Sequence, residues 1–368
     1  MNVARWRPAA AAAGACLGLA LVMPSAATAA PTPISRYVQT NLVSDQAGVA
    51  EIMDPNLVNP WGASYLGNSP LWVSDNGTGV TTLYSGGVHG SPQTIVPLVV
   101  SIPGGLPTGQ VSNSTPDFVV KAPDGTSGPA FFIFVGLTGH ITGWNPAVGT
   151  NGGTPPSTHA QNVKVSKGSA YTGVAMGQVG ARPRLYAANF ATGEVEMYGP
   201  KWGRIKIPGA FTDSQLPADF APFNVMVAGE AVYVAYAERN DEGDEVHGPG
   251  LGRVDRYTLD GTLVQRMQHT ERLNAPWGMT IAPAGFGDLT GDLLVGNFGD
   301  GRIHAFDPTT FARRGVLLDT HGNPVVIDGL WAILPGNGTE GGTDEIIFTA
   351  GPDDETHGLL GTLSLAAD

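Results

Sequence analysis

Short apolar runs and glycine-bearing turns alternate along most of this chain. Six times, an apolar run is followed by a turn and a second strand, in which a glycine precedes an aromatic residue or a leucine by five positions. A strand, a glycine turn and a strand in this order predict a β-hairpin. The six pairs are Gly79 and Tyr84, Gly139 and Trp144, Gly193 and Tyr198, Gly252 and Tyr257, Gly301 and Phe306, and Gly358 and Leu363.

The hairpins recur at the spacing of a propeller repeat. Their first strands begin at residues 71, 132, 185, 232, 293 and 346, which are 47 to 61 residues apart. This spacing fits blades of roughly 40 to 50 residues with loops of variable length added. A short apolar strand precedes each hairpin, as at 61–63, 117–120 and 277–279, and candidate outer strands follow, as at 95–100 and 263–267. This pattern predicts an all-β fold, a six-bladed β-propeller with four-stranded antiparallel blades.

The last unit contains only three candidate strands, and an unassigned β-rich segment, 36–44, precedes the first unit. We therefore expect this N-terminal strand to complete the last blade and close the ring, which leaves only short sheet edges. The composition agrees, because 52 glycines and 29 prolines supply turns and no long stretch of helical periodicity follows the N-terminus.

The first 30 residues have the parts of a secretory signal peptide: basic Arg5 and Arg7, an apolar run over 9–23 and small residues at 27–29. We expect a signal peptide at 1–30, a single propeller domain at 31–368, and a secreted, extracellular protein. Cys16, the only cysteine, lies inside the signal; lipidation there is the alternative. Without disulfides, sheet packing and ring closure must stabilise the mature protein.

The net charge of −13 argues against nucleic acid or an anionic membrane as a partner, because an acidic surface repels phosphate groups. No second apolar run approaches the ~20 residues of a membrane span. We expect a monomer that does not insert into a membrane.

Up-and-down topology predicts which loops share a side of the ring. The connections between blades and the turns between the second and third strands emerge together on one side, which we call the entry rim because each inner strand begins there. The opposite side is the exit rim. The expected ligand-binding residues gather on the entry rim: Asn59, Trp61, Asn76, Asn189, Trp277, Asn297 and Trp331.

Two interpretations of these residues remain open. Asparagines at strand ends commonly bond their own backbone, so Asn189 and Asn297 could either cap turns or contact a ligand. The tryptophans could pack between blades, or form an aromatic wall at the central channel on which a sugar ring or another flat ligand stacks.

Two acidic loops on the entry rim, 238–248 and 353–358, contain His-Gly pairs at His247 and His357. Neighbouring carboxylates can orient an imidazole and tune its pKa, so these histidines are the candidate catalytic residues for proton transfer; simple solvent exposure is the alternative. The carboxylates also suit Ca²⁺ or another divalent cation, although neither loop has calcium-loop spacing. We find no serine-nucleophile elbow, zinc helix or phosphate-binding loop.

Longer motifs lie at 59–62, 273–279, 294–303, 327–331 and 350–359. They resemble those of a family of secreted bacterial proteins of unassigned function with an NHL-like six-bladed propeller. The likeness covers nearly all of the expected mature chain. It implies a secreted propeller but no particular reaction.

A looser resemblance is to the gluconolactonase and senescence-marker group of propellers, whose mouths hold a divalent cation between Asn and Asp residues at the starts of inner strands. Asn224 and Asp328 occupy positions of that type and are the metal ligands that the resemblance implies. Trp61 and Trp277 stand where further polar ligands would be needed.

Two functions follow as hypotheses, and both an enzyme and a binding protein remain open. The first is a secreted propeller that binds a small molecule, glycan or extracellular protein at the polar, tryptophan-lined mouth of its central channel. The alternative is a metal-dependent hydrolase or lyase of the lactonase type, in which the cation polarises an ester or lactone carbonyl.

Overall fold

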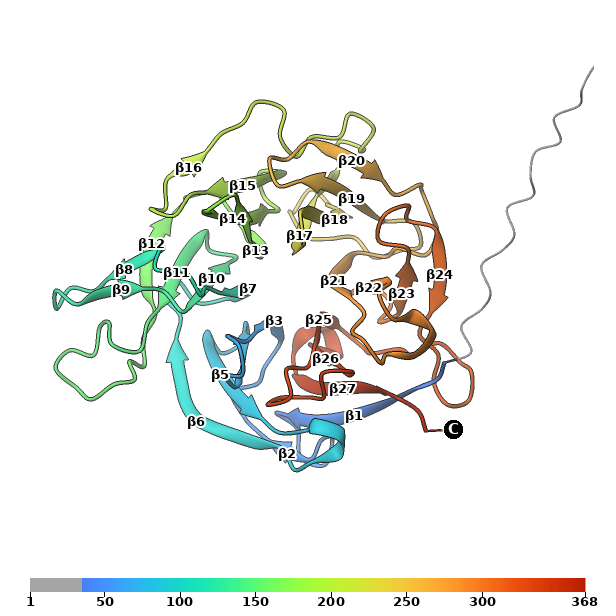
Figure 1. Ribbon diagram of the computed structural model, residues 1–368, viewed down its shortest axis with the longest axis horizontal. Helices are drawn as coiled ribbons and strands as arrows, with labels where there is room; N and C mark the ends of the chain where they lie inside the picture. The colour runs from blue at the N-terminus through green and yellow to red at the C-terminus, as the bar shows by residue number, and fades with distance from the viewer. Residues whose placement is uncertain (1–34, 368) are drawn as a thin grey trace, which may run out of the picture. The chain divides into compact units, whose positions relative to one another are not determined.

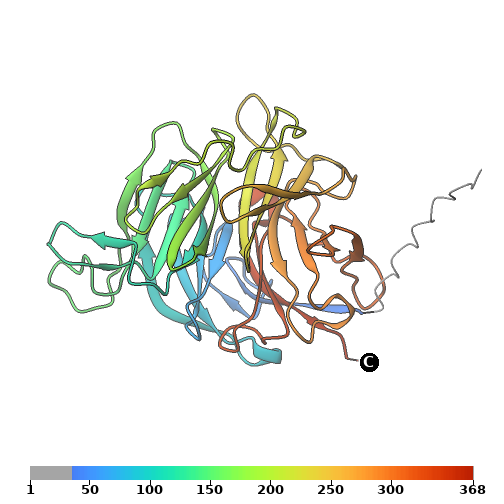
Figure 2. The same ribbon diagram turned by 45° about the horizontal axis from the view of Figure 1, so that its top comes forward.

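The computed structural model describes residues 35–367, which form a ring of six antiparallel sheets around a central axis (Figure 1). Figure 2 shows the blades standing side by side around that axis. The predicted all-β, six-bladed propeller is confirmed. The expected signal peptide, 1–30, lies outside the described residues.

In each of the first three blades, one strand lies at the axis and three follow it outward. Blade 1 contains β3 (Pro60–Ser64), β4 (Leu71–Asp75), β5 (Val80–Ser85) and β6 (Thr94–Ser101). Blade 2 contains β7 (Pro107–Ser112), β10 (Phe132–Gly136), β11 (His140–Trp144) and β12 (Gln161–Val165). Blade 3 contains β13 (Tyr171–Val179), β14 (Arg182–Asn189), β15 (Glu194–Tyr198) and β16 (Arg204–Ile205).

The last three blades follow the same order. Blade 4 contains β17 (Phe220–Ala228), β18 (Ala231–Glu238), β19 (Gly252–Thr258) and β20 (Leu263–Arg266). Blade 5 contains β21 (Pro276–Ile281), β22 (Leu293–Asn297), β23 (Ile303–Phe306) and β24 (Arg313–Val316). Blade 6 contains β25 (Leu330–Pro335), β26 (Ile346–Ala350), β27 (Leu359–Leu365) and β1 (Tyr37–Ser44), with the short β2 (Ile52–Met53) outside β1.

Blade 6 joins the two ends of the described chain. β1 pairs antiparallel with β27, from Tyr37 opposite Leu365 to Ser44 opposite Leu359. The prediction that segment 36–44 closes the last blade is confirmed.

The expected inner strand of blade 2 at 117–120 is wrong. The inner strand is β7, whereas Val119–Lys121 forms β8, which pairs with β9 (Ser127–Pro129) in a separate hairpin. β7 has no apolar run because it packs tightly at the axis, where Thr108 and Gln110 are buried and hydrogen-bonded. The short apolar run around β8 has the same sequence pattern as an inner strand, which explains the wrong prediction.

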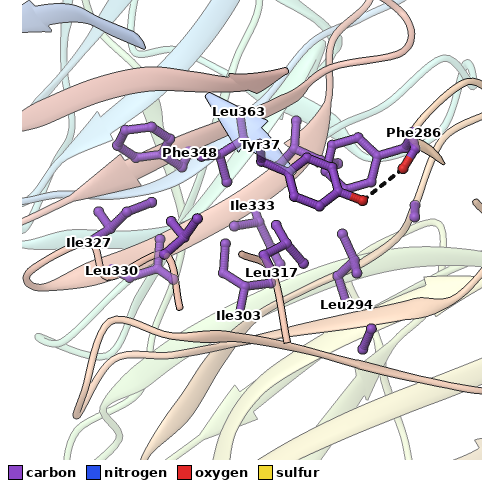
Figure 3. Packing of buried hydrophobic residues seen from close by; sticks show 14 of the residues in the cluster. Tyr37, Phe286, Leu294, Ile303, Leu317, Ile327, Leu330, Ile333, Phe348 and Leu363 are labelled. Atoms are coloured by element: carbon purple, nitrogen blue, oxygen red, sulfur yellow. Dashed lines mark hydrogen bonds between the residues drawn. The ribbon is translucent and has the colours of Figure 1, made fainter. Parts of the chain in front are cut away.

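The hydrophobic core is divided among the contacts between blades. A separate buried cluster lies between each pair of neighbouring blades, and a further one lies near the axis. Figure 3 shows the cluster between blades 5 and 6, where Tyr37 of the closing strand stacks on Phe286 with 4.5 Å between ring centroids. The Tyr37 hydroxyl donates to the Phe286 carbonyl at 2.9 Å. Closure of the ring therefore also completes a core.

The described residues contain three helical segments, each a single turn: η1 (Val88–Gly90), η2 (Gly287–Leu289) and α1 (Pro352–Glu355). Within residues 35–367, no helix has the length and apolar character needed to cross a membrane.

Candidate functional site

Side-chain hydrogen bonds tie the inner strands together at the axis. Each inner strand pairs with a neighbour on one side only, so its remaining backbone groups need other partners. Asn224 Nδ2 donates to the Trp277 carbonyl at 2.8 Å, and Trp277 Nε1 donates to the Thr172 carbonyl at 3.0 Å. Gln110 Nε2 donates to the Gly62 carbonyl at 3.0 Å. Each of these bonds links two different blades.

Glycines allow the inner strands to approach one another. A Cβ atom on Gly62 would lie 2.6 Å from the Thr108 carbonyl oxygen, and one on Gly109 would lie 2.7 Å from the Val174 nitrogen. A Cβ on Gly278 would lie 2.4 Å from a carbonyl oxygen of blade 6. Because these neighbours are backbone atoms, no side-chain movement could make room. Trp61-Gly62 and Trp277-Gly278 therefore mark places where the inner strands of neighbouring blades approach closely.

The inner strands enclose a cavity of about 400 Å³ at the ring axis. It is lined by 62–65, 109–111, 174–176, 224–227, 277–279 and 332–334. Since these segments run toward the exit rim, where Tyr65, Met226 and Leu334 are partly exposed, the cavity opens on that side.

The cavity wall is mostly apolar, and none of its lining residues is charged. Two polar atoms of the wall, Gln110 Oε1 and Ser64 Oγ, are buried without a hydrogen-bond partner in the part of the chain that the structure describes. Buried polar groups normally have partners. The hydrogen-bonding capacity of these two atoms is therefore unused among the described residues. The sequence pattern points to neither residue. Gln110 lies on β7, which lacks the pattern of an inner strand, and Ser64 follows the recognised run 61–63.

The three predicted tryptophans lie together between the cavity and the entry rim. Trp331 is 0% exposed, and its ring is stacked between Trp61 at 3.6 Å and Phe298 at 3.9 Å between centroids. Trp277 meets Trp61 edge-on at 6.1 Å and is the one of the three that lines the cavity. The cluster fills the entry-rim half of the axis. The faces of its rings are largely covered by other rings of the same cluster. Ligand contact at Trp61 and Trp331 stays a prediction.

The predicted asparagines are buried and hydrogen-bonded within the protein. Asn189 Nδ2 donates to Glu196 and Ser169, and Asn297 Nδ2 donates to Asp300 and the Arg272 carbonyl. Asn76 Nδ2 donates to the Pro107 carbonyl at 3.1 Å. Asn59 Oδ1 accepts from Trp331 Nε1 at 2.9 Å. The contacts of Asn189 and Asn297 favour the capping interpretation, whereas Asn76 and Asn59 bond to residues of neighbouring blades. A ligand role for the four residues stays a prediction.

The two candidate catalytic histidines have separate carboxylate partners. His247, about half exposed, faces Glu245 at 3.5 Å, and the hydrogen bond with Glu245 raises the pKa of His247. Its ring meets Phe298 edge-on at 5.1 Å. His357 Nδ1 lies 2.8 Å from Asp45 Oδ2, so it ties the last blade to the segment after β1. Among the described residues, no hydrogen bond or ion pair joins the two histidines.

Glu355 comes close to His247 and is held by a strained turn. Asp353, Asp354 and Glu355 have φ values of 54°, 51° and 64°, a left-handed conformation that costs energy for residues other than glycine. Asn59 Nδ2 donates to Glu355 Oε2 at 2.5 Å. Burial raises the pKa of Glu355, while the Asn59 hydrogen bond opposes the rise. The turn thus carries a half-buried carboxyl group over the aromatic cluster.

The candidate metal ligands are both engaged with the protein. Asn224 donates to Trp277, and its Oδ1 accepts from the Val225 nitrogen at 2.8 Å. Asp328 Oδ2 accepts from the Asp353 nitrogen at 3.0 Å. In residues 35–367 no group of three or more His, Cys, Asp or Glu side chains is arranged to hold a metal. Among the described residues, no contact supports the metal hypothesis, and Ca²⁺ binding stays a prediction.

Comparisons with known proteins find relatives along most of the chain. No protein-family model matches. Uncharacterized protein R648 of Acanthamoeba polyphaga mimivirus is 31% identical over 328 residues, which cover 88% of this chain and 78% of that protein. Uncharacterized protein L690 of the same virus is 31% identical over 330 residues, which cover 88% of this chain and 84% of that protein. Both are viral, so the bacterial and secreted character implied by the motifs stays a prediction.

Solved structures support the fold. An α-L-arabinofuranosidase of Fusarium graminearum, in complex with an iminosugar inhibitor, superposes with a TM-score of 0.55 at 11% identity. The match covers 89% of this chain and 98% of that one. At this identity the likeness concerns the propeller fold and carries no activity across.

Proposed function

The chain belongs to the family of these two mimivirus proteins, and we propose that it is a secreted propeller that binds a small, uncharged molecule in the cavity on the ring axis. The observation that carries this proposal is the cavity of about 400 Å³ with two unpartnered polar atoms in its wall. Small-molecule sites are typically concave, of roughly 300–1,000 Å³, and apolar apart from a few orienting polar groups. The size favours a small molecule over a glycan chain or a protein.

The lining restricts the chemistry of the ligand. An ionised ligand would lose its hydration and find no opposite charge among the lining residues. Gln110 Oε1 is a hydrogen-bond acceptor, so the ligand should offer a hydroxyl or amide N–H. The Ser64 hydroxyl can donate or accept. The ligand is expected to enter from the exit rim, because the aromatic cluster fills the other half of the axis.

The proposal of secretion rests on the sequence of residues 1–30. It is tested by N-terminal sequencing of the protein recovered from the culture medium of an expressing host. A mature N-terminus near residue 31 is expected. Protein that stays inside the cells and retains residues 1–30 would contradict the proposal of secretion.

Binding in the cavity is tested by ligand-observed NMR with a library of neutral hydroxyl and amide fragments and their ionised counterparts of equal size. Two variants at one position give the control. Ser64→Trp fills the cavity and should abolish binding of neutral fragments, whereas Ser64→Ala removes only the hydroxyl and should weaken it by about 3- to 10-fold. Fragments that bind the Ser64→Trp protein unchanged, or equal binding by ionised counterparts, would rule out this site. Thermal unfolding checks that both variants fold.

A further inference from the structure

A second cavity, of about 380 Å³, lies at the outer side of blades 4 and 5. The connection between β20 and β21 forms one wall, and the segments around β23 and β24 form the other. Its lining includes Arg266, His269, Arg272, Phe306, Phe311 and Arg313. On a chain with net charge −13, a cavity lined by three arginines is a local reversal of charge.

Two of these arginines lack a carboxylate partner. Arg266 is paired with Asp213, and His269 faces Glu271 at 3.9 Å. Next to the cavity, Asp307 is paired with Arg314 at 3.1 Å. No carboxylate of the described residues lies within ion-pair distance of Arg272 or Arg313. Burial, and then the charge of Arg272, lower the pKa of Arg313, so the two cations lie close enough to repel each other.

The rest of the wall is apolar. Phe306 and Phe311 are 3% and 7% exposed, and Met267 lies beside them. Phenylalanine rings next to guanidinium groups suit a ligand that combines an anionic group with an apolar or aromatic body.

An unpartnered polar atom lies next to the cavity. His304 is two residues before Phe306 on β23, with 6.5 Å between the ring centroids. It is 7% exposed, and its Nδ1 has no hydrogen-bond partner in residues 35–367. Burial and the charges of Arg272 and Arg313 lower the pKa of His304 to about 4. The imidazole is therefore neutral at physiological pH and adds no positive charge beside the cavity, whose lining does not include it.

We propose that this cavity binds a small organic anion, a phosphate ester or carboxylate with an apolar body, through Arg272 and Arg313. The two guanidinium groups take the anionic group, and the Phe306 and Phe311 rings contact the body. This site is distinct from the axial cavity, whose lining has no charge.

The proposal is tested by isothermal titration calorimetry with phenyl phosphate, benzoate and inorganic phosphate in low-salt buffer. Phenyl phosphate or benzoate should bind saturably, and inorganic phosphate at least 10-fold more weakly because it lacks the apolar body. The double variant Arg272→Gln, Arg313→Gln should weaken binding by at least 10-fold.

The matched control is Arg314→Gln, which removes the same charge from the adjacent position, where the arginine is already paired with Asp292 and Asp307. It should change the affinity by less than twofold. Equal losses in Arg314→Gln and the double variant would show a general charge effect and overturn the proposal, as would the absence of saturable binding of all three probes at millimolar concentration. Ser64→Trp should leave this binding intact, so failure here is distinguishable from failure of the axial site.

Discussion

At the scale of single residues, many of the polar groups in this propeller serve the fold. Four side-chain amides form hydrogen bonds with neighbouring backbone or side chains, those of Asn59, Asn76, Asn189 and Asn297. Buried acids do the same. Glu340 is 0% exposed, and both of its carboxyl oxygens lie 3.0 Å from Gln93 Nε2. A polar residue in a rim loop is therefore weak support for function unless an atom of it stays unpartnered.

Glu340 predicts a pH dependence of stability. Burial raises its pKa from 4.5 to about 8, so between these pH values the folded protein keeps a proton that the unfolded chain releases. The stabilisation is complete below about pH 4.5 and is lost as the pH rises through about 8. At pH 8, Glu340→Gln, which stays neutral, should have a free energy of unfolding about 1–3 kcal/mol higher than that of wild type. It should therefore unfold at a higher denaturant concentration. At pH 4 the difference in free energy of unfolding between Glu340→Gln and wild type should be smaller.

The control for this prediction is Glu242→Gln, in an exposed loop. It removes the same charge without changing a buried group, and its unfolding curves should follow wild type from pH 4 to 8.5. Chemical denaturation across this range makes the measurement. A constant difference between Glu340→Gln and wild type would show that Glu340 does not titrate between these values.

At the scale of elements, the sequence identifies the hairpins because their pattern is local. A glycine turn followed five residues later by a buried side chain such as Tyr84, Tyr198 or Tyr257 depends on the hairpin alone. Inner strands are harder to recognise. β7 is shaped by contacts with other blades, through Gly109 against blade 3 and Gln110 against blade 1, and no local pattern reports such contacts.

The glycine contacts at the axis give a prediction for one element. Gly109→Ala places a Cβ within 2.7 Å of the Val174 nitrogen and 2.8 Å of the Gly173 Cα. Because only backbone can move, the variant should lose about 1–3 kcal/mol of stability. Gly203→Ala is the matched control, since its Cβ would meet nothing within 4 Å, and it should be neutral or slightly stabilising. Thermal unfolding of both variants tests this; equal midpoints would contradict close packing of the inner strands.

At the scale of the whole molecule, both proposed sites are products of the ring. The axial cavity is assembled from one segment of each blade, and only the segments with Asn224 and Trp277 contain residues that the sequence marks as candidates. The outer cavity brings Arg272, in the connection from blade 4 to blade 5, next to Arg313 on β24 of blade 5. Topology alone could predict the entry-rim loops, but it could not predict that aromatic side chains fill the axis there. The candidate sites therefore depend on packing between blades, which the sequence pattern does not report.

Ring closure gives the last prediction. Deleting residues 31–44 removes β1, leaves the edge of β27 unpaired and takes Tyr37 out of the core between blades 5 and 6. An exposed strand edge promotes association with other chains, so the truncated protein should aggregate or lose cooperative unfolding, whereas a chain that begins at residue 35 should match the full mature protein.

A synthetic peptide of residues 35–45 should restore cooperative unfolding, because it can pair with β27 and return Tyr37 to its place beside Phe286. The same peptide with Tyr37→Ala should rescue much less, since it restores the backbone pairing without the buried ring. Size-exclusion chromatography and thermal unfolding make the measurements. A truncated protein that stays monomeric with an unchanged melting midpoint would mean that the ring does not depend on β1 for its stability.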